Sequence, residues 1–129
     1  NVIFDTGSEF LTITSTLCRG SDIGCQSQSY DMNDSLTQMS VSDYESVITY
    51  GSAELTGQLW NDLICFEKAP KADERRYVGC LVPFEHNFLA LSGSVGLEED
   101  YIDGILGLSP GNAFPEYEEE HILPMMRKN

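Results

Sequence analysis

The chain has 129 residues, 41% of them hydrophobic, and its 21 acidic and 7 basic side chains give a formal net charge of −14. This length and hydrophobic content predict one compact domain or lobe with a real core. The acidic balance argues against a nucleic-acid-binding protein, because binding phosphates requires clustered cations. No apolar run approaches the ~20 residues that span a bilayer, which argues against a membrane partner.

Short strands separated by Gly, Ser, Asn and Asp are predicted along most of the chain. The apolar run Val2–Phe4 ends at Asp-Thr-Gly, and residues 10–14 alternate between apolar and polar as in a half-buried strand. A natural chain rarely begins inside a strand, so we expect a fragment or a trimmed mature chain. Residues 19–42 are mainly polar, with Gly, Ser, Asp and Asn throughout, and predict a surface loop.

A hairpin is predicted over residues 47–60, where two strand-like runs meet around Gly51. Residues 63–66 and 77–82 predict a second hairpin, because two further apolar runs flank a charged segment. The apolar run 88–91 predicts another strand.

The end of the chain combines a buried segment with a helix signal. Residues 102–108 are a short apolar run broken by glycines. Between residues 116 and 128 the charges change from acidic to basic, which is the order that a helix dipole favours. The predicted fold is therefore all-β: a lobe of antiparallel strands and hairpins with one short C-terminal helix.

Four cysteines are present, and none forms a Cys-x-x-Cys pair. Their even number, in pairs that are local in sequence, predicts the disulfides Cys18–Cys25 and Cys65–Cys80. Two disulfides imply an oxidising compartment.

The two histidines, His86 and His121, have no ligand partners close in sequence, so no metal site is expected. We expect both in loops or at the surface, and neither as a catalytic base. Asn33 begins an Asn-Asp-Ser glycosylation sequon, which agrees with passage through the secretory pathway. Such sequons also arise by chance.

Asp5 is the best candidate for a catalytic carboxylate. It ends an apolar strand and is followed by Thr6, Gly7 and Ser8. The glycine lets the backbone turn sharply and approach a partner closely, and the two hydroxyls can fix a carboxylate by hydrogen bonds. An ordinary turn after a strand explains the tripeptide alone at least as well.

Several segments resemble, in the right order, the amino-terminal lobe of pepsin-like aspartic proteases (peptidase family A1). Each match is weak alone, and together they cover essentially the whole chain. They are residues 3–8 (first active-site motif), 18–25 (disulfide loop in its longer, cathepsin D-like form), 34–37 (Ser-Ser-Thr stretch), 48–57 (flap), Asp62 (start of the next strand), 103–108 (Asp-Gly-Ile-Leu-Gly-Leu run) and 122–129 (following helix).

The resemblance implies roles for the residues around Asp5. Asp5 would be one of two catalytic aspartates. Thr6 and Gly7 would form the loop that pairs with its twin in the other lobe, and Ser8 would hydrogen-bond the aspartate. Residues 105–107 would thread behind this loop.

The resemblance also implies a flap. Tyr50 would lie over the substrate, with Gly51 and Ser52 offering backbone contacts to it. The tryptophan that the family usually has seven residues after the catalytic aspartate is Thr12 here, so we expect the flap to be held differently or to move more freely. Glu54 would place a charge near the cleft mouth.

No second Asp-Thr-Gly or Asp-Ser-Gly is present, although the mechanism needs two carboxylates that share one proton. The resemblance therefore implies that residues 1–129 are the amino-terminal lobe of an aspartic endopeptidase, without its first strand and second lobe, and inactive alone. The enzyme would cleave polypeptides without a cofactor. It would reside in a lysosome, an acidic vacuole or the extracellular space.

Three alternatives stay open. A retroviral-type homodimer would use one Asp-Thr-Gly per chain, but the disulfide loop and the position of residues 103–108 argue against it. A pepsin-like binding protein would keep the cleft and lose the second aspartate, and Thr12 leaves this open. The third is an unrelated secreted β-domain with disulfides.

Overall fold

A computed structural model of the chain describes residues 2–18, 29–51, 53–65, 80–81, 86–96, 102–110 and 121–123. Most of these residues lie in β-strands and very few in helices, so the all-β prediction is confirmed. The elements are β1 (Val2–Asp5), β2 (Leu11–Thr14), the 3-10 helix η2 (Met32–Asp34), β3 (Met39–Tyr50), β4 (Ala53–Asn61), β5 (Ile64–Cys65), β6 (Cys80–Leu81), β7 (Asn87–Val95) and β8 (Gly104–Gly107). The predicted terminal helix is described only at residues 122–123, which are helical.

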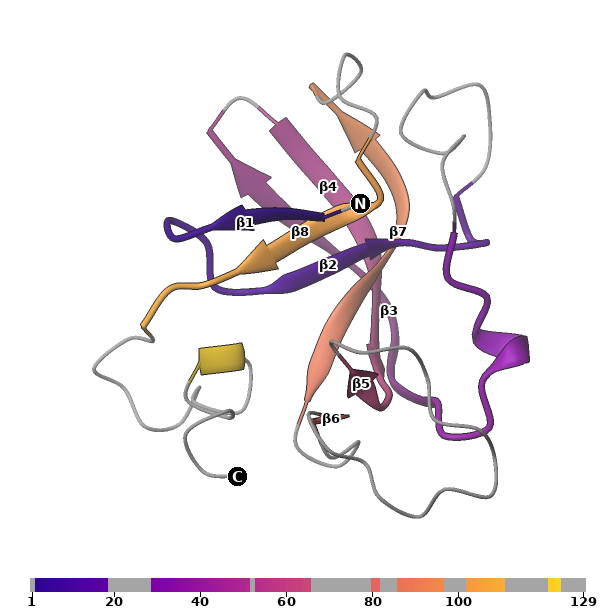
Figure 1. Cartoon of the computed structure of the whole chain (residues 1–129). Helices are drawn as coiled ribbons and strands as arrows, with labels where there is room; N and C mark the ends of the chain where they lie inside the picture. Colours follow the sequence, from indigo (N-terminus) through magenta and orange to yellow (C-terminus); the bar gives the residue numbers. More distant parts are fainter. Residues whose placement is uncertain are drawn as a thin grey trace.

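Six strands form one mixed sheet in the order β1-β8-β2-β7-β4-β3, and Figure 1 shows β8 lying between β1 and β2. The pairs β3–β4, β4–β7 and β2–β8 are antiparallel, as expected. The pairs β1–β8 and β2–β7 are parallel. Hairpin patterns in a sequence reveal only strands joined by a short turn, and neither parallel pair is joined in this way.

The predicted hairpin around Gly51 is confirmed, and it is longer than expected because β3 begins at Met39. Residues 39–42 were predicted to belong to a surface loop, and this part of the prediction is wrong. β3 is an edge strand whose residues are mostly exposed. Polar side chains are therefore compatible with a strand here, and composition did not distinguish the strand from a loop.

The second predicted hairpin is present as the short antiparallel pair β5–β6, in which Cys65 lies directly opposite Cys80. The side chains of these two cysteines lie outside the described residues, as does Cys25. Both predicted disulfides therefore stay predictions.

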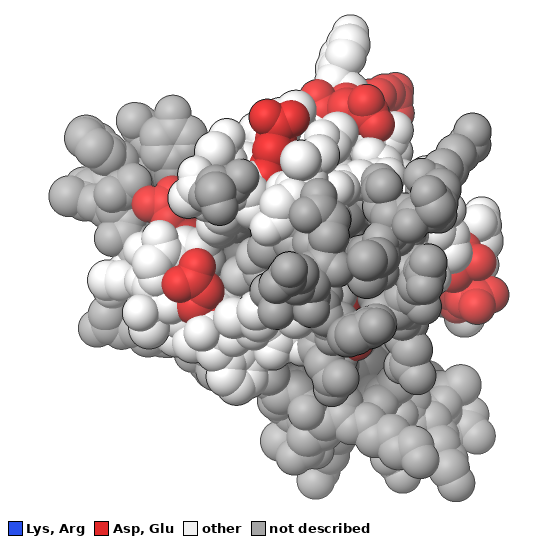
Figure 2. Space-filling model, turned by 90° about the horizontal axis from the view of Figure 1, so that it is seen from above, with Lys and Arg blue, Asp and Glu red and all other residues white. Residues whose placement is uncertain are grey.

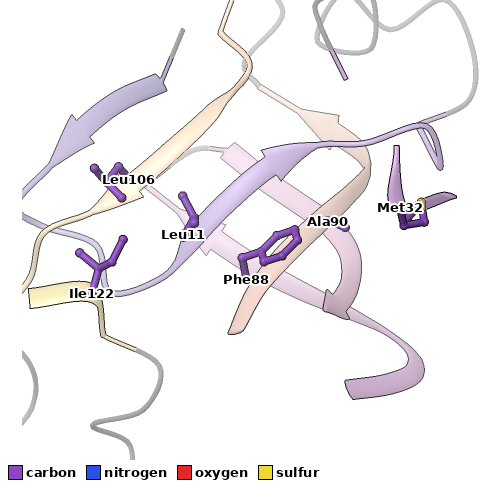
Figure 3. Close-up of a cluster of buried hydrophobic side chains, with 6 residues drawn as sticks. All are labelled: Leu11, Met32, Phe88, Ala90, Leu106 and Ile122. Atoms are coloured by element: carbon purple, nitrogen blue, oxygen red, sulfur yellow. The ribbon is translucent and has the colours of Figure 1, made fainter. Parts of the chain in front are cut away.

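Two apolar clusters lie on opposite faces of β7 because successive side chains of a strand point to opposite sides. Phe88 and Ala90 belong to one cluster, and Leu89 and Leu91 to the other. Figure 3 shows the first cluster, in which Phe88 and Ala90 are joined by Leu11, Met32, Leu106 and Ile122. β7 is thus buried on both faces, which explains its unbroken apolar run. Trp60 packs against the first cluster, as expected.

The edge strand β1 exposes its apolar side chains. Val2 and Ile3 are 42% and 41% exposed, and Phe4 is 68% exposed. Among the described strands, β1 pairs only with β8. An apolar strand with this much exposed surface is a surface that another segment could cover.

His86 and His121 are buried, at 0% and 2% exposure. Both lie outside helices and strands, as expected, but the prediction of surface positions is wrong. His86 immediately precedes β7, where the chain enters the core. The polarity of the side chain did not indicate this burial, because an imidazole ring has an apolar body as well as polar atoms.

Candidate active site

Asp5 lies at the last position of β1, where the chain turns towards β2. The amide of Gly7 donates to Asp5 Oδ1 at 2.9 Å. The carbonyl oxygen of Asp5 accepts from the amide of Leu108 at 2.8 Å. The carboxylate is partly exposed, so it is fixed in orientation and still accessible.

Ser8 bonds to Asp5 through the main chain. Its hydroxyl donates to the carbonyl oxygen of Asp5, over a long 3.5 Å, and a role in holding the carboxylate stays a prediction. The tight turn brings the amide of Gly7, rather than the hydroxyl of Ser8, to the carboxylate. Ser8 is nevertheless buried, so it packs beneath the loop.

The end of β8 passes directly beside the Asp5 loop, as the resemblance implied for residues 105–107. The amide of Gly107 donates to the carbonyl of Phe10 at 3.1 Å, and the amide of Ser109 donates to the carbonyl of Ser8 at 2.9 Å. A Cβ atom on Gly107 would lie 2.6 Å from the carbonyl carbon of Glu9. Only glycine allows this approach, because it has no side chain.

Tyr50 ends β3 at the tip of the hairpin, where Gly51 turns the chain with a φ of +55°. The ring packs against the cluster formed by Leu55, Leu89, Leu91 and Ile105. Its hydroxyl oxygen is buried without a hydrogen bond.

The electrostatic surroundings of Tyr50 connect the hairpin to the Asp5 loop. Burial is the main cause that raises the pKa of Tyr50, and the negative charges of Asp5 and Glu9 raise it further. The Ser8 hydroxyl is close enough to lower this pKa, although the two hydroxyls form no hydrogen bond of good geometry. Tyr50 therefore lies within electrostatic range of the loop that carries Asp5.

The sequence model of the eukaryotic aspartyl proteases matches residues 1–128. The chain belongs to this family. Members are aspartic-type peptidases, so the substrates are polypeptides. No curated protein matches the chain.

Thr12 occupies the position where members of the family usually have a tryptophan. The side chain is fully buried, and its Oγ1 accepts a hydrogen bond from the amide of Ile105 at 3.2 Å. Thr12 therefore joins β2 to β8 and offers no partner to Tyr50.

Glu54 lies on the outer face of the hairpin in this aspartyl protease. It is exposed, whereas its neighbours Ala53 and Leu55 are buried. Ala53 pairs directly with Tyr50 in the ladder, so Tyr50 and Glu54 lie on opposite faces. Among the other predicted flap residues, Gly51 is exposed, and Ser52 lies outside the described residues.

Asp62 is a buried carboxylate. The sequence resemblance predicted only that it starts the strand after the hairpin. Its Oδ2 accepts from the Tyr30 hydroxyl at 2.6 Å, and its Oδ1 accepts from the hydroxyl of Thr37 and from the amide of Leu63. Burial alone would raise the pKa of Asp62, but hydrogen bonds led by those from Thr37 and Tyr30 outweigh it and lower the pKa. The network attaches Tyr30 and Thr37 to the end of β4. Thr37 is the last residue of the Asp-Ser-Leu-Thr stretch, so this stretch contributes one of the hydrogen bonds to Asp62.

Asn33 lies in η2 with its side chain exposed, and its Nδ2 donates to Asp31 Oδ1 at 2.9 Å. Glycosylation at Asn33 stays a prediction. Within the described ranges, no group of three or more His, Cys, Asp or Glu side chains could hold a metal ion. The same part of the chain contains no helix that is long and apolar enough to cross a membrane.

Proposed function

We propose that Asp5 is one carboxylate of a two-aspartate site that hydrolyses peptide bonds. The observation that carries the proposal is the position of Asp5, which is held by Gly7 and Leu108 beside β8 and lies within electrostatic range of Tyr50. The second carboxylate comes from outside residues 1–129, which form the amino-terminal lobe.

The two carboxylates share one proton, because like charges this close cannot both ionise easily. The ionised member takes a proton from a water molecule, whose oxygen attacks the carbonyl carbon of the peptide bond. The protonated member donates its proton to the carbonyl oxygen. The tetrahedral intermediate then collapses: the carboxyl that took the proton from water gives it to the nitrogen, a hydroxyl of the intermediate returns a proton to the other carboxylate, and the C–N bond breaks to release an amine and a carboxylic acid. The Gly7 amide keeps Asp5 Oδ1 in a fixed orientation during these steps.

The surface of β1 is where the rest of the active site would be added. Val2, Ile3 and Phe4 expose apolar surface beside Asp5. Burying a fully exposed apolar side chain contributes about 1.5–3 kcal/mol, and covering these partly exposed ones contributes a corresponding fraction of it. A further lobe that packs here would bring its own aspartate close to Asp5.

Tyr50, with Gly51 and Ser52, is the part of the lobe that would cover a bound substrate. Tyr50 lacks the tryptophan partner at position 12, and its buried hydroxyl makes no hydrogen bond. A movement of the hairpin would bring this hydroxyl to a substrate. Its ring packs on Ile105 and Leu55, which keeps the hairpin over the loop.

The enzyme would mature in the secretory pathway and act in a lysosome, an acidic vacuole or outside the cell. Cys65 and Cys80 are direct cross-strand partners, and this position brings Cβ atoms to roughly disulfide distance. A Cys18–Cys25 bond would close the loop formed by residues 18–25. Asn33 is exposed, as a glycan acceptor must be.

The test uses the full-length protein and an unfolded protein as substrate at acid pH. We expect cleavage that pepstatin inhibits and that Asp5→Asn abolishes. Asp43→Asn, on the exposed edge strand β3, is the matched control and should retain full activity. Cleavage that survives Asp5→Asn would overturn the assignment. A folded full-length protein without any cleavage would favour the pepsin-like binding protein, and activity confined to a dimer of this lobe would favour the homodimer.

A further inference from the structure

A pocket of about 320 Å³ lies beside the edge strand β3 and is lined by Leu17, Glu45, Gln58 and Ser92. These four residues come from the segment after β2 and from the neighbouring strands β3, β4 and β7. Pockets that bind small molecules have volumes of roughly 300–1,000 Å³. The pocket is therefore large enough for a small ligand or for one long side chain of a partner.

The pocket is separate from the candidate active site. β7 pairs with β2 up to Thr14, the last residue of β2, and Ser92 follows this point. The loop that carries Asp5 leads into the other end of β2. Leu17 packs against the first apolar cluster, whereas Tyr50 packs against the second, on the opposite face of β7. A ligand in the pocket would therefore lie away from Asp5 and Tyr50.

The sheet is irregular on both sides of β4 at this pocket. In the ladder with β7, two consecutive residues of β4 pair with Leu91 and Gly93, so Ser92 between them is an extra residue that bulges β7. In the ladder with β3, the register shifts between Ser40 and Glu45. Bulges re-aim side chains and are over-represented next to active sites. Two of the residues that line the pocket thus lie where the ladder departs from regular pairing.

The bulged serine holds the carboxylate of Glu45. Ser92 Oγ donates to Glu45 Oε1 at 2.9 Å, and it also lies 3.3 Å from the carbonyl oxygen of Thr56. Gln58 pairs directly with Glu45 in the ladder, so their side chains lie on the same face. A carboxylate can accept at about four positions. The bond from Ser92 therefore orients Glu45 and leaves it able to accept from a ligand.

The polar groups of the pocket match a primary ammonium group. Glu45, Gln58 and Ser92 each carry an oxygen that can accept a hydrogen bond. An alkylammonium group has three N–H donors and no acceptor, and its alkyl chain can pack on Leu17. A guanidinium group is bound best by both oxygens of one carboxylate, and here Ser92 already bonds to Oε1.

The charge around the pocket also favours a cation. All 7 basic residues of the sequence lie outside the described part of the chain, so within that part no Lys or Arg is present to neutralise Glu45. Figure 2 shows acidic side chains at several places on the face that it presents. The net charge of −14 raises the local concentration of cations at the surface.

We propose that this pocket binds a primary alkylammonium group, which is the chemistry of a lysine side chain and of a free aliphatic amine. The ammonium group bonds to Glu45, Gln58 and Ser92, and the alkyl chain lies along Leu17. The inference is independent of the proposed function, because it concerns a different place in the fold and predicts binding rather than cleavage.

The experiment measures binding to the full-length protein at pH 7 by saturation-transfer NMR. The probes are Nα-acetyl-lysine N-methylamide and Nα-acetyl-norleucine N-methylamide, which differ only by the terminal ammonium group. We expect the lysine probe to bind at least about fivefold more tightly. Glu45→Gln should reduce its affinity to that of the norleucine probe, and Gln58→Met should weaken it. Asp43→Asn, an exposed neighbour on β3 that does not line the pocket, should leave it unchanged.

A third probe, n-butylamine, distinguishes the two sources of the ammonium group. Tighter binding of the lysine probe than of butylamine indicates a polypeptide ligand, and the reverse indicates a free amine. Equal binding of the lysine and norleucine probes would overturn the inference, as would a lysine preference that survives Glu45→Gln. An equal loss in Asp43→Asn would also overturn it, because net charge alone would then explain the binding. Thermal unfolding checks that each variant is folded, and Gln58→Met keeps the test decisive if Glu45→Gln is not.

Discussion

The main-chain carbonyl of Asp5 accepts a hydrogen bond from the amide of Leu108, so the segment that follows β8, far from Asp5 in the sequence, fixes the loop that carries the carboxylate. β8 can approach this closely only because Gly104 and Gly107 lack side chains. A Cβ on Gly104 would lie 2.0 Å from the carbonyl oxygen of Thr12. The geometry of the candidate site therefore depends on these glycines as well as on Asp5.

Gly107→Ala is expected to separate β8 from the Asp5 loop, because the added methyl group meets backbone atoms that cannot rotate away. We expect the free energy of unfolding to fall by about 1–3 kcal/mol or more. Peptidase activity should fall even under conditions in which the variant remains folded. Urea unfolding and activity assays measure both effects. Gly93→Ala is the control, since no atom lies within 4 Å of its added Cβ, and an equal effect there would contradict the explanation.

Tyr30→Phe is expected to weaken the network around Asp62, because it removes the hydrogen bond to Asp62 Oδ2. A hydrogen bond to a charged group contributes about 1.5–3 kcal/mol, so we expect a loss of this size at pH 7. Since folding lowers the pKa of Asp62, its contribution is present above the unfolded pKa and is lost as pH falls through the folded pKa.

The cost of Tyr30→Phe should therefore shrink between pH 7 and pH 3, as measured by urea unfolding at both values. Tyr44→Phe, at a tyrosine that is 82% exposed, should change stability little at either pH. A cost for Tyr30→Phe that is independent of pH would argue against the carboxylate as its cause.

His86 should make the lobe less stable in acid. Burial lowers its pKa from 6.5 to about 4, and both ring nitrogens lack a hydrogen-bond partner. The unfolded chain therefore binds a proton that the folded chain does not. The stability contributed by neutral His86 is complete above about pH 6.5 and is lost as pH falls to about 4. The shift corresponds to about 3 kcal/mol.

Replacement of His86 by phenylalanine removes the titrating group and keeps a ring of similar shape. The fall in unfolding free energy between pH 7 and pH 4 should then be smaller by up to about 3 kcal/mol. Chemical unfolding of both proteins at a series of pH values checks this. Parallel curves for the two proteins would show that His86 does not titrate in this range.

Phe4→Ser in the full-length protein tests whether another segment covers β1. If Phe4, 68% exposed here, is buried by a second lobe, the substitution should cost about 1.5–3 kcal/mol. Val47→Ser, at a residue that is 57% exposed on the opposite edge strand, should cost under about 0.5 kcal/mol. Equal, small effects would mean that β1 remains uncovered.

Local signals predicted much of the fold. The turn at Gly51 and the apolar run of β7 are short-range features, and both elements were predicted from them. The pairing of Asp5 with Gly107 joins residues far apart in the chain, and only the family resemblance indicated that these segments lie together. No feature of either segment's sequence indicated that β1 and β8 pair in parallel.

The candidate site was predicted by position and less well by contact. Asp5 ends a strand, as expected, but the sequence did not indicate that the Gly7 amide bonds to its carboxylate while the Ser8 hydroxyl bonds to its main-chain carbonyl. The sequence drew attention to Glu54 because it is near Tyr50 in the chain. The negative charges of Asp5 and Glu9, which are far from Tyr50 in the sequence, raise the pKa of Tyr50 in the folded lobe.

The pairing of β1 with β8 also bears on how the protein is made. During synthesis the Asp5 loop leaves the ribosome early, but the carbonyls of Asp5 and Ser8 gain their partners only when Leu108 and Ser109 have emerged. Such long-range pairs form late, whereas a hairpin such as β3–β4 closes locally. The nascent chain would therefore carry Asp5 on an unfinished loop until Leu108 and Ser109 have emerged.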